Sequence, residues 1–190
     1  PFAGLSANTN EAIAALAALV HADDDLSLLQ PAPPKPPAGI VLKLSAAGVQ
    51  MALTSLAPGP DIAFDDLGEA DAADMLALAT LTRPGPFRAR TQTLGRFVGV
   101  REGGRLIAMA GERLQTDQFV EVSGICTHPD HRGRGLAAAL TRIVTARILE
   151  DGQTPFLHAY ATNAGAISIY RTLGFVHRTD VVHAMWTRAS

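Results

Sequence analysis

Residues Ile125–Leu140 read ICTHPDHRGRGLAAAL and are the most informative segment of the chain. An apolar run typical of a strand leads into a loop with two arginines and two glycines, and an alanine–leucine run typical of a helix follows. Backbone N–H groups at a helix N-terminus lack helical partners and, with the helix dipole, bind anions. Gly133 and Gly135 permit close approach, and Arg132 and Arg134 add forked donors suited to phosphate. The stretch therefore predicts a pyrophosphate-binding turn.

Composition excludes several other classes of protein. The chain has 190 residues, 47% of them hydrophobic and 18% charged, which is typical of a globular protein with its own core. A net charge of -2 offers no basic field for nucleic acid or an anionic membrane, and no apolar run is long enough to span a bilayer. The only cysteine, Cys126, and histidines without ligand spacing lead us to expect no metal and a cytoplasmic location.

The order of elements predicts two parts. Residues 1–57 are expected to form an N-terminal lobe with a helix at 10–20, a proline-rich connector and a pair of strands joined by a turn at Ala47-Gly48. Residues 58–190 are expected to form the main domain, with a mixed sheet and helices on its faces. Its expected elements are a helix at 66–81, a hairpin at 97–101 and 105–111, a strand at 119–127 with a bulge or close approach at Gly124, a helix at 136–149, a strand at 156–161, a helix at 163–173 and a strand at 181–186.

Two named motifs overlap in the glycine–arginine turn. Gly133–Ala138 matches G-x-G-x-x-A, a dinucleotide fingerprint, but the next strand runs into Thr162-Asn163 instead of the acid that would hold a ribose. Arg132–Ala137 matches R-x-x-G-x-A, which resembles the acetyl-CoA pyrophosphate signature of the GNAT superfamily of N-acetyltransferases. Downstream, Asn163–Phe175 is similar to that superfamily's second signature, N-x-x-A-x-x-x-Y-x-x-x-G-F. Two ordered motifs at compatible spacing favour the GNAT interpretation over the dinucleotide one.

The resemblance implies a fold and a cofactor. The fold is α/β (α+β), a mixed and mainly antiparallel central sheet with helices on both faces, and the co-substrate is acetyl-CoA. The strand that carries Ile125 is expected to splay from the strand that carries Leu157, so that the cofactor arm lies between them. The residues implied in cofactor binding are Ile125, Cys126, Thr127, Arg132, Gly133, Arg134, Gly135, Leu136, Ala137, Asn163, Ala166 and Tyr170.

Acyl transfer to an amine needs a base for the amine proton and an acid for the departing thiolate. The resemblance places the Tyr170 hydroxyl near the thioester sulfur as the acid. Glu121 is the first candidate for the base, directly or through water, and Glu112 and His128 are second choices. Strand alternation places Glu121, Ser123 and Ile125 on one face unless a bulge at Gly124 intervenes. Arg83 and Phe87, in a proline-rich loop, are candidates for binding the acceptor.

The sequence thus predicts an acetyl-CoA-dependent N-acetyltransferase that acts on a primary amine by direct attack in a ternary complex. The acceptor is a small molecule or a peptide, and a homodimer is expected from the superfamily. Two alternatives stay open. One is a non-catalytic acyl-CoA-binding or sensor module, and the other, based on the G-x-G-x-x-A match, is an NAD-dependent oxidoreductase.

Overall fold

A computed structural model describes residues 2–21 and 24–189. The chain divides into two compact units. Unit 1 comprises Pro1–Gln50, Ala159–Ala164 and His177–Ser190, and unit 2 comprises Met51–His158 and Gly165–Val176. The C-terminal residues therefore make their contacts in unit 1, together with the N-terminal part. A division into separate domains at residues 57 and 58 stays a prediction.

Unit 1 is a small sheet with one helix. Leu16 of α1 (Asn10–Ala18) and Val20, just after the helix, form a buried cluster with Leu26, Leu28 and Trp186. The Thr9 side chain caps α1 by accepting a hydrogen bond from the Ala12 amide, at 3.2 Å. The strand order is β1 (Phe2–Ala3), β2 (Leu26–Gln30), β9 (Phe175–Arg188) and β3 (Ile40–Leu53), and the last two strands also extend into unit 2.

The predicted strand pair at 40–44 and 49–53 is wrong, because β3 is one continuous strand. The expected turn at Ala47-Gly48 is extended backbone instead. The Ala47 carbonyl accepts a hydrogen bond from the Ala161 amide at 2.9 Å, and a Cβ on Gly48 would lie 3.0 Å from the Ala159 carbonyl oxygen. Close backbone pairing therefore holds this segment straight, although its glycine is typical of a turn.

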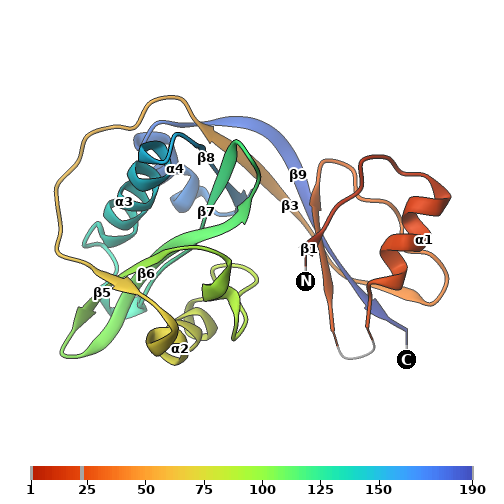
Figure 1. Cartoon of the computed structure of the whole chain (residues 1–190), viewed down its shortest axis with the longest axis horizontal. Coiled ribbons are helices and arrows are strands. Elements are labelled where there is room, and N and C mark those ends of the chain that lie inside the picture. Colours follow the sequence, from red (N-terminus) through yellow and green to blue (C-terminus); the bar gives the residue numbers. More distant parts are fainter. Residues whose placement is uncertain (1, 22–23, 190) are drawn as a thin grey trace. The chain divides into compact units, whose positions relative to one another are not determined.

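The strands of the described residues form one nine-stranded sheet, and unit 2 holds five neighbouring strands of it (Figure 1). The pairings from β4 (Asp65–Leu67) through β7 (Phe119–Thr127) are antiparallel, and the pairing of β7 with β8 (Thr154–Tyr160) is parallel. The predicted hairpin and the strand at 119–127 are confirmed, and the mixed, mainly antiparallel fold class is confirmed with them. In order across the sheet the strands are β8 (Thr154–Tyr160), β7 (Phe119–Thr127), β6 (Arg105–Gln115), β5 (Phe97–Glu102) and β4 (Asp65–Leu67).

The helices of unit 2 cover both faces of its sheet. Met75, Leu78 and Ala79 of α2 (Ala72–Thr82) pack into a buried cluster with Phe97 and Met109. The longer α3 (Leu136–Glu150) lies against β6 and β7 from the other side (Figure 1). The face that α2 covers is called the α2 face below.

The helix predicted at 66–81 begins later than expected. Asp65–Leu67 pairs with β5 as strand β4, and a short 3-10 turn at Glu69–Asp71 precedes α2. The Asp71 carboxylate accepts a hydrogen bond from the Gly68 amide at 2.9 Å, which closes that turn. An acidic run typical of a helix start is therefore divided between an edge strand, a turn and the helix. The helices α3 and α4 (Ala164–Thr172) lie within a residue or two of their predicted bounds.

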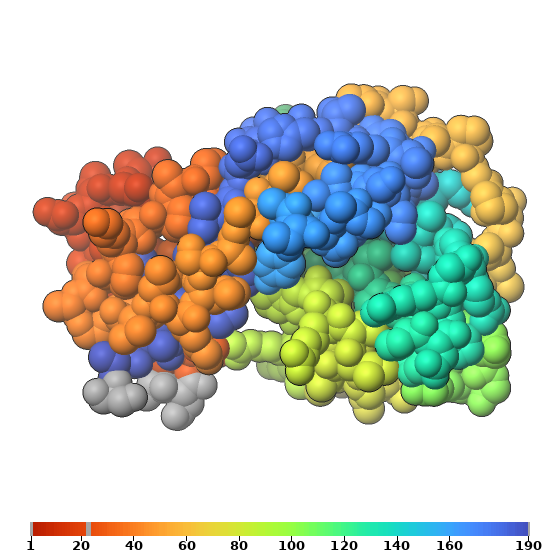
Figure 2. Space-filling view, turned by 180° about the vertical axis from the view of Figure 1, so that it is seen from behind, coloured from red at the N-terminus to blue at the C-terminus, as the bar shows by residue number. Residues whose placement is uncertain are grey.

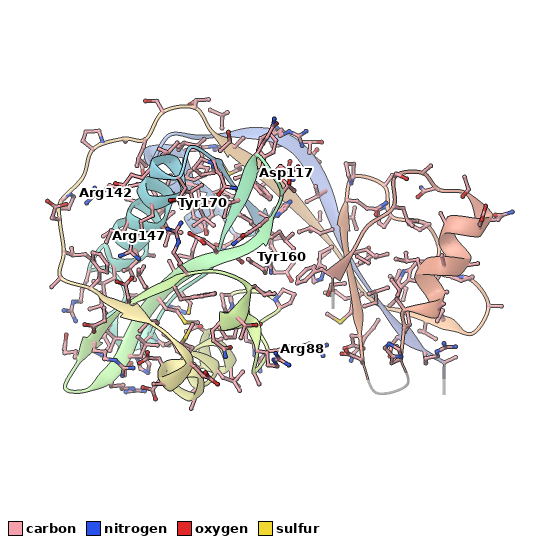
Figure 3. All side chains as sticks on the ribbon, in the orientation of Figure 1. Arg88, Asp117, Arg142, Arg147, Tyr160 and Tyr170 are labelled. Atoms are coloured by element: carbon pink, nitrogen blue, oxygen red, sulfur yellow. The ribbon has the colours of Figure 1, made fainter. Side chains whose placement is uncertain are left out.

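A strap formed by residues 54–64 crosses the outer side of α3, as the orange to yellow segment in Figures 1 and 2 shows. Arg142 of α3 donates to the Pro60 carbonyl at 2.7 Å and pairs with Asp61, while Arg147 pairs with Asp66 and lies over the Phe64 ring. Figure 3 shows both arginines directed from α3 toward the strap. These contacts hold α3, and hence its N-terminus, against the sheet. No helix among residues 2–21 and 24–189 has both the length and the apolar character needed to cross a membrane.

Candidate active site

Strand β7 contains a bulge at Gly124, where φ is +63°. Met109 lies opposite Cys126, but Gly111, two residues further along β6, lies opposite Ser123, three residues back along β7. One extra residue is therefore inserted in β7, and such an insertion reverses the facing of side chains beyond it. The predicted irregularity is confirmed, and Ser123 and Cys126 share a face.

That shared face is the α2 face. A Cβ on Gly111 would collide with the ring of Phe97, which belongs to the cluster beneath α2. Ser123 lies opposite Gly111, so it points the same way, and Glu121 does so by strand alternation. Ile125 lies beyond the bulge and takes the opposite face. The sequence alone did not show whether Ile125 shares a face with Glu121 and Ser123, and the bulge at Gly124 places it on the opposite face.

The loop after α2 brings Phe87 to the bulge. The Phe87 and Phe97 ring centroids are 5.9 Å apart in an edge-to-face arrangement, and a Cβ on Gly124 would lie 3.6 Å from the Phe87 ring. Arg83 caps the C-terminus of α2 in the left-handed region, with φ +51°, and its side chain is exposed. An aromatic wall thus lies over the bulge on the α2 face, and the acceptor-binding role of both residues stays a prediction.

The strands β7 and β8 separate after Glu121, just before the bulge. Their parallel pairing covers Phe119 to Glu121 on one strand and Thr154 to Phe156 on the other, and it ends there. Both strands nevertheless continue, to Thr127 and Tyr160. The unpaired backbone of the two strands is thus available to a third, extended group, as the sequence resemblance implies for the cofactor arm.

Glu121 lies at the last paired position, in a buried ionic cluster. Arg113 donates to both of its oxygens, from Nε to Oε2 at 2.8 Å and from Nη2 to Oε1 at 2.7 Å. The His158 Nδ1 lies 2.7 Å from Oε1. The side chains of Glu121, Arg113 and His158 are only 1%, 8% and 10% exposed. Burial by itself raises the pKa of Glu121, but the His158 hydrogen bond and the Arg113 charge outweigh it, so the pKa lies below its usual value.

The second-choice bases are also engaged. Glu112 is buried and accepts two hydrogen bonds from the Arg96 guanidinium, at 2.9 and 2.6 Å, and one from the Arg96 amide, at 3.2 Å. His128 is buried with its Nε2 2.6 Å from Nη2 of Arg105. It lines a pocket of about 180 Å³ on the α2 face, with Arg105, Asp74 and apolar residues of α2 and β6. Neither residue belongs to the Glu121 cluster.

The loop before α3 has the backbone that anion binding needs. Gly133 and Gly135 have φ values of +77° and +75°, and a Cβ on either would meet nothing within 4 Å. Gly135 occupies the N-cap position of α3, where it supplies no side-chain cap, and the first turn of the helix holds no acidic residue. The amides of Leu136 and Ala137 therefore begin the helix without a side-chain acceptor.

The two arginines of this loop differ in their surroundings. Arg134 donates to the Glu102 carboxylate at 2.8 Å and lies 2.9 Å from His131 Nδ1. Arg132 is exposed, and its guanidinium forms no ion pair with any residue in the described ranges. Only Arg132 is thus an uncompensated cation at the turn, whereas Arg134 would have to exchange or share Glu102 to reach a phosphate.

The end of β7 holds two further predicted residues. Burial raises the pKa of the Cys126 thiol to about 11, so the thiol is protonated at neutral pH and is a poor nucleophile. The Thr127 Oγ1 atom is buried without a hydrogen-bond partner among the described residues. A buried hydroxyl of this kind is costly unless something bonds it. An open glycine turn, an uncapped helix, an uncompensated arginine and an orphaned hydroxyl together fit a ligand with a pyrophosphate and amide groups.

Tyr170 lies on α4 and is labelled in Figure 3. It is 7% exposed, and its ring contacts that of Phe175 edge-to-face. Burial raises the pKa of its phenol to about 12, so the hydroxyl keeps its proton. Ala166 is half-buried in the same helix, and Asn163 is exposed just before it, in unit 1.

Sequence reasoning missed Arg113 and His158. Both face Glu121, but His158 is 37 positions away in the chain, and no spacing rule connects residues of two different strands. Arg113 follows the mainly apolar run from Leu106 to Gly111 in β6, and a cation at the end of such a run was a local signal that a carboxylate lay nearby. Among the described residues, no group of three or more His, Cys, Asp or Glu side chains could hold a metal ion.

Comparisons with known proteins agree with this geometry. The family described as FR47-like protein matches residues 97–186, which span β5 to β9. A mycothiol acetyltransferase from Corynebacterium jeikeium is 42% identical over 76 residues, or 39% of this chain and 21% of that protein. Mycothiol acetyltransferases from Mycolicibacterium gilvum and Streptomyces coelicolor match to a similar extent, so the chain spans less than a third of the length of these curated relatives.

Solved structures extend the match to the whole chain. The E. coli ribosomal-protein-S18-alanine N-acetyltransferase shares the fold at 20% identity, with a TM-score of 0.56 over 67% of this chain and 94% of that one. A Novosphingobium aromaticivorans protein assigned to the GNAT family of acetyltransferases is 41% identical, with a TM-score of 0.90. That match covers 100% of this chain and 85% of the other. On this similarity, together with the turn before α3 and the separation of β7 from β8, the chain belongs to the GNAT family.

Proposed function

We propose that the chain transfers an acetyl group from acetyl-CoA to a primary amine, by direct attack in a ternary complex. The observation that carries the proposal is the turn of Gly133 and Gly135 at the uncapped N-terminus of α3, beside the separated ends of β7 and β8. A diphosphate fits the first feature and an extended amide-containing arm fits the second. Family membership supports the same cofactor.

Acetyl-CoA supplies the activated acyl group, as a thioester. Leu136 and Ala137 would hold its pyrophosphate by their amides, with Arg132 as the first cation and Arg134 as the second. Ile125 to Thr127 would offer backbone groups to the arm, and the orphaned Thr127 hydroxyl would gain a partner there. Asn163 and Ala166 are proposed cofactor contacts from the second signature of the family.

The chain's own residues meet the chemical needs of the reaction. Burial raises the pKa of Tyr170 to about 12, so its hydroxyl is protonated at neutral pH and is available to donate a hydrogen bond, and then the proton, to the departing thiolate. Glu121 supplies the negative charge that supports removal of the amine proton, inside its cluster with Arg113 and His158. Phe87 would form a wall of the acceptor site, and the exposed Arg83 would meet an acidic group on the acceptor.

The acceptor is proposed as the primary amine of a small molecule or a peptide. The aromatic edge of Phe87 favours an acceptor with apolar surface next to its amino group. A homodimer is proposed on family grounds, and light scattering on the purified protein tests it.

Calorimetry tests the cofactor. Acetyl-CoA, CoA, dephospho-CoA and NAD are titrated separately into the protein, and we expect acetyl-CoA and CoA to bind and NAD to give no signal. Saturable NAD binding that acetyl-CoA cannot displace would overturn the proposal in favour of an oxidoreductase. A panel of small amines and short peptides then tests catalysis, with thiol release as the readout. Acetyl-CoA binding without transfer to any member would point to a non-catalytic binding module.

A further inference from the structure

The carboxylate of Glu121 is fully engaged by other side chains. Its Oε2 accepts from Arg113 Nε, and its Oε1 accepts from Arg113 Nη2 and contacts His158 Nδ1, all within 2.8 Å. The side chain is 1% exposed. A base has to reach the proton that it removes, within hydrogen-bond distance or through one water. Glu121 is therefore well placed to orient its neighbours and poorly placed to meet an acceptor itself.

The contact with Glu121 sets the tautomer of His158. An ionised carboxylate only accepts hydrogen bonds, so the proton between His158 Nδ1 and Glu121 Oε1 must lie on Nδ1. In a neutral imidazole the second nitrogen, Nε2, then carries the lone pair and acts as the acceptor. The ring also contacts Phe156 edge-to-face, at 5.6 Å between centroids, which further restricts its orientation. His158 is thus a histidine with a defined proton-accepting nitrogen.

His158 lies on the face where an acceptor would bind. Glu121 pairs with Phe156 across the parallel ladder, and His158 follows two residues later on the same face of β8. This is the α2 face, on which Phe87 lies at the bulge. His158 is also just beyond the last β7–β8 pair, where the strands separate. Among Glu121, Arg113 and His158, it is thus the member placed past the end of the ladder.

We infer that His158 takes the proton of the attacking amine at Nε2, and that Glu121, held by Arg113, is a positioning residue that orients the ring. The inference rests on the proposed function and names the base for it. The transfer breaks an N–H bond of the amine and the C–S bond of the thioester, and it forms C–N and S–H bonds. His158 receives the proton from nitrogen, Tyr170 gives one to sulfur, and exchange with solvent restores both residues.

The tautomer can be measured without cofactor or acceptor. Long-range ¹H–¹⁵N spectra of protein labelled in its histidines distinguish a protonated Nδ1 from a protonated Nε2, and loss of one signal in His158→Ala assigns the residue. We expect Nδ1 to carry the proton in the neutral ring. The double variant Arg113→Met, Glu121→Leu removes the carboxylate without leaving a buried charge, and this preference should then disappear. A neutral His158 protonated at Nε2 in the unmodified protein would overturn the inference.

Kinetics with the amine that transfers fastest in the panel test the catalytic role. His158→Ala should lower kcat by roughly 10²- to 10⁴-fold, the usual contribution of a general base, with the acetyl-CoA Kd by calorimetry unchanged. Added imidazole should restore part of the rate to His158→Ala, and none to the Arg113→Met, Glu121→Leu variant, which still has its own imidazole. His177→Ala is the matched control, because His177 also pairs with a carboxylate, that of Asp180 at 2.8 Å, but is exposed on unit 1. It should transfer at the wild-type rate.

The outcomes separate the inference from the proposed function. Transfer at the wild-type rate by His158→Ala overturns the inference and leaves the function standing. Loss of transfer without imidazole rescue, or with weakened acetyl-CoA binding, makes His158 structural and also overturns it. If the unmodified protein transfers to no amine, the proposed function and the catalytic role of His158 fail together, whatever the tautomer.

Discussion

The ion pair of Arg113 and Glu121 should behave as a buried unit in unfolding experiments. The two side chains are 8% and 1% exposed and share two hydrogen bonds of 2.7 and 2.8 Å. Removing either partner leaves the charge of the other buried without its oppositely charged partner, which costs about 3–5 kcal/mol. We therefore expect Arg113→Met and Glu121→Leu each to lower the free energy of unfolding by that amount. For a chain of this size the melting temperature should fall by roughly 6–20 °C.

The double variant separates the pair from its surroundings. Replacing both charges by apolar side chains of similar volume is often neutral, but here it also deprives the His158 Nδ1 proton of its acceptor. A buried unsatisfied donor costs about 1–3 kcal/mol, so the double variant should be more stable than either single variant. Urea unfolding followed by circular dichroism provides all three values. Additive losses, or single losses below about 1 kcal/mol, would refute the argument that the pair is buried and coupled.

The pairing of Glu121 with Arg113 should also make the free energy of unfolding depend on pH in the acid range. The pKa of Glu121 is lowered in the folded protein, so its contribution is present above the unfolded pKa and is lost as pH falls through the folded pKa. Glu121→Gln has no group to titrate, and its unfolding free energy should depend less on pH in the acid range. Parallel curves for wild type and Glu121→Gln would contradict the lowered pKa.

Three further predictions concern the cofactor turn, the acid and the strap. Arg132→Ala should raise the acetyl-CoA Kd by roughly 5- to 30-fold, because one phosphate contact is worth about 1–2 kcal/mol. Arg134→Ala should raise the Kd less, because Arg134 already pairs with the Glu102 carboxylate. Calorimetry measures both values, and equal effects would refute the distinction between the two arginines. Tyr170→Phe should lower kcat by about 10²-fold or more with little change in that Kd, whereas an unchanged kcat would remove Tyr170 from the chemistry. Gly174→Ala should destabilise the protein more than Gly152→Ala in urea unfolding. Both glycines have positive φ, which costs an alanine about 1–2 kcal/mol. At Gly174 the new Cβ would in addition collide with the Ser55 carbonyl of the strap.

Short-range patterns in the sequence predict the local elements and the glycine turn before α3. The strand at 119–127, the helix that begins at Leu136 and the glycines that need positive φ depend on neighbours within a few residues, so short-range patterns revealed them. The bulge at Gly124 was visible for the same reason. Two ordered motifs were then enough to indicate the family that the comparisons show.

Which residues meet across strands depends on long-range contacts that the local patterns do not show. Ala47 and Gly48 look like a turn, but pairing with residues more than a hundred positions later keeps β3 extended. Glu121 looks like a surface carboxylate on an alternating strand, yet Arg113 and His158 from the two neighbouring strands bury it and take up its oxygens. Such contacts depend on strand order and register, which no local pattern encodes. The physical reason is that a side chain's charge state and partners are set by whatever the fold packs against it.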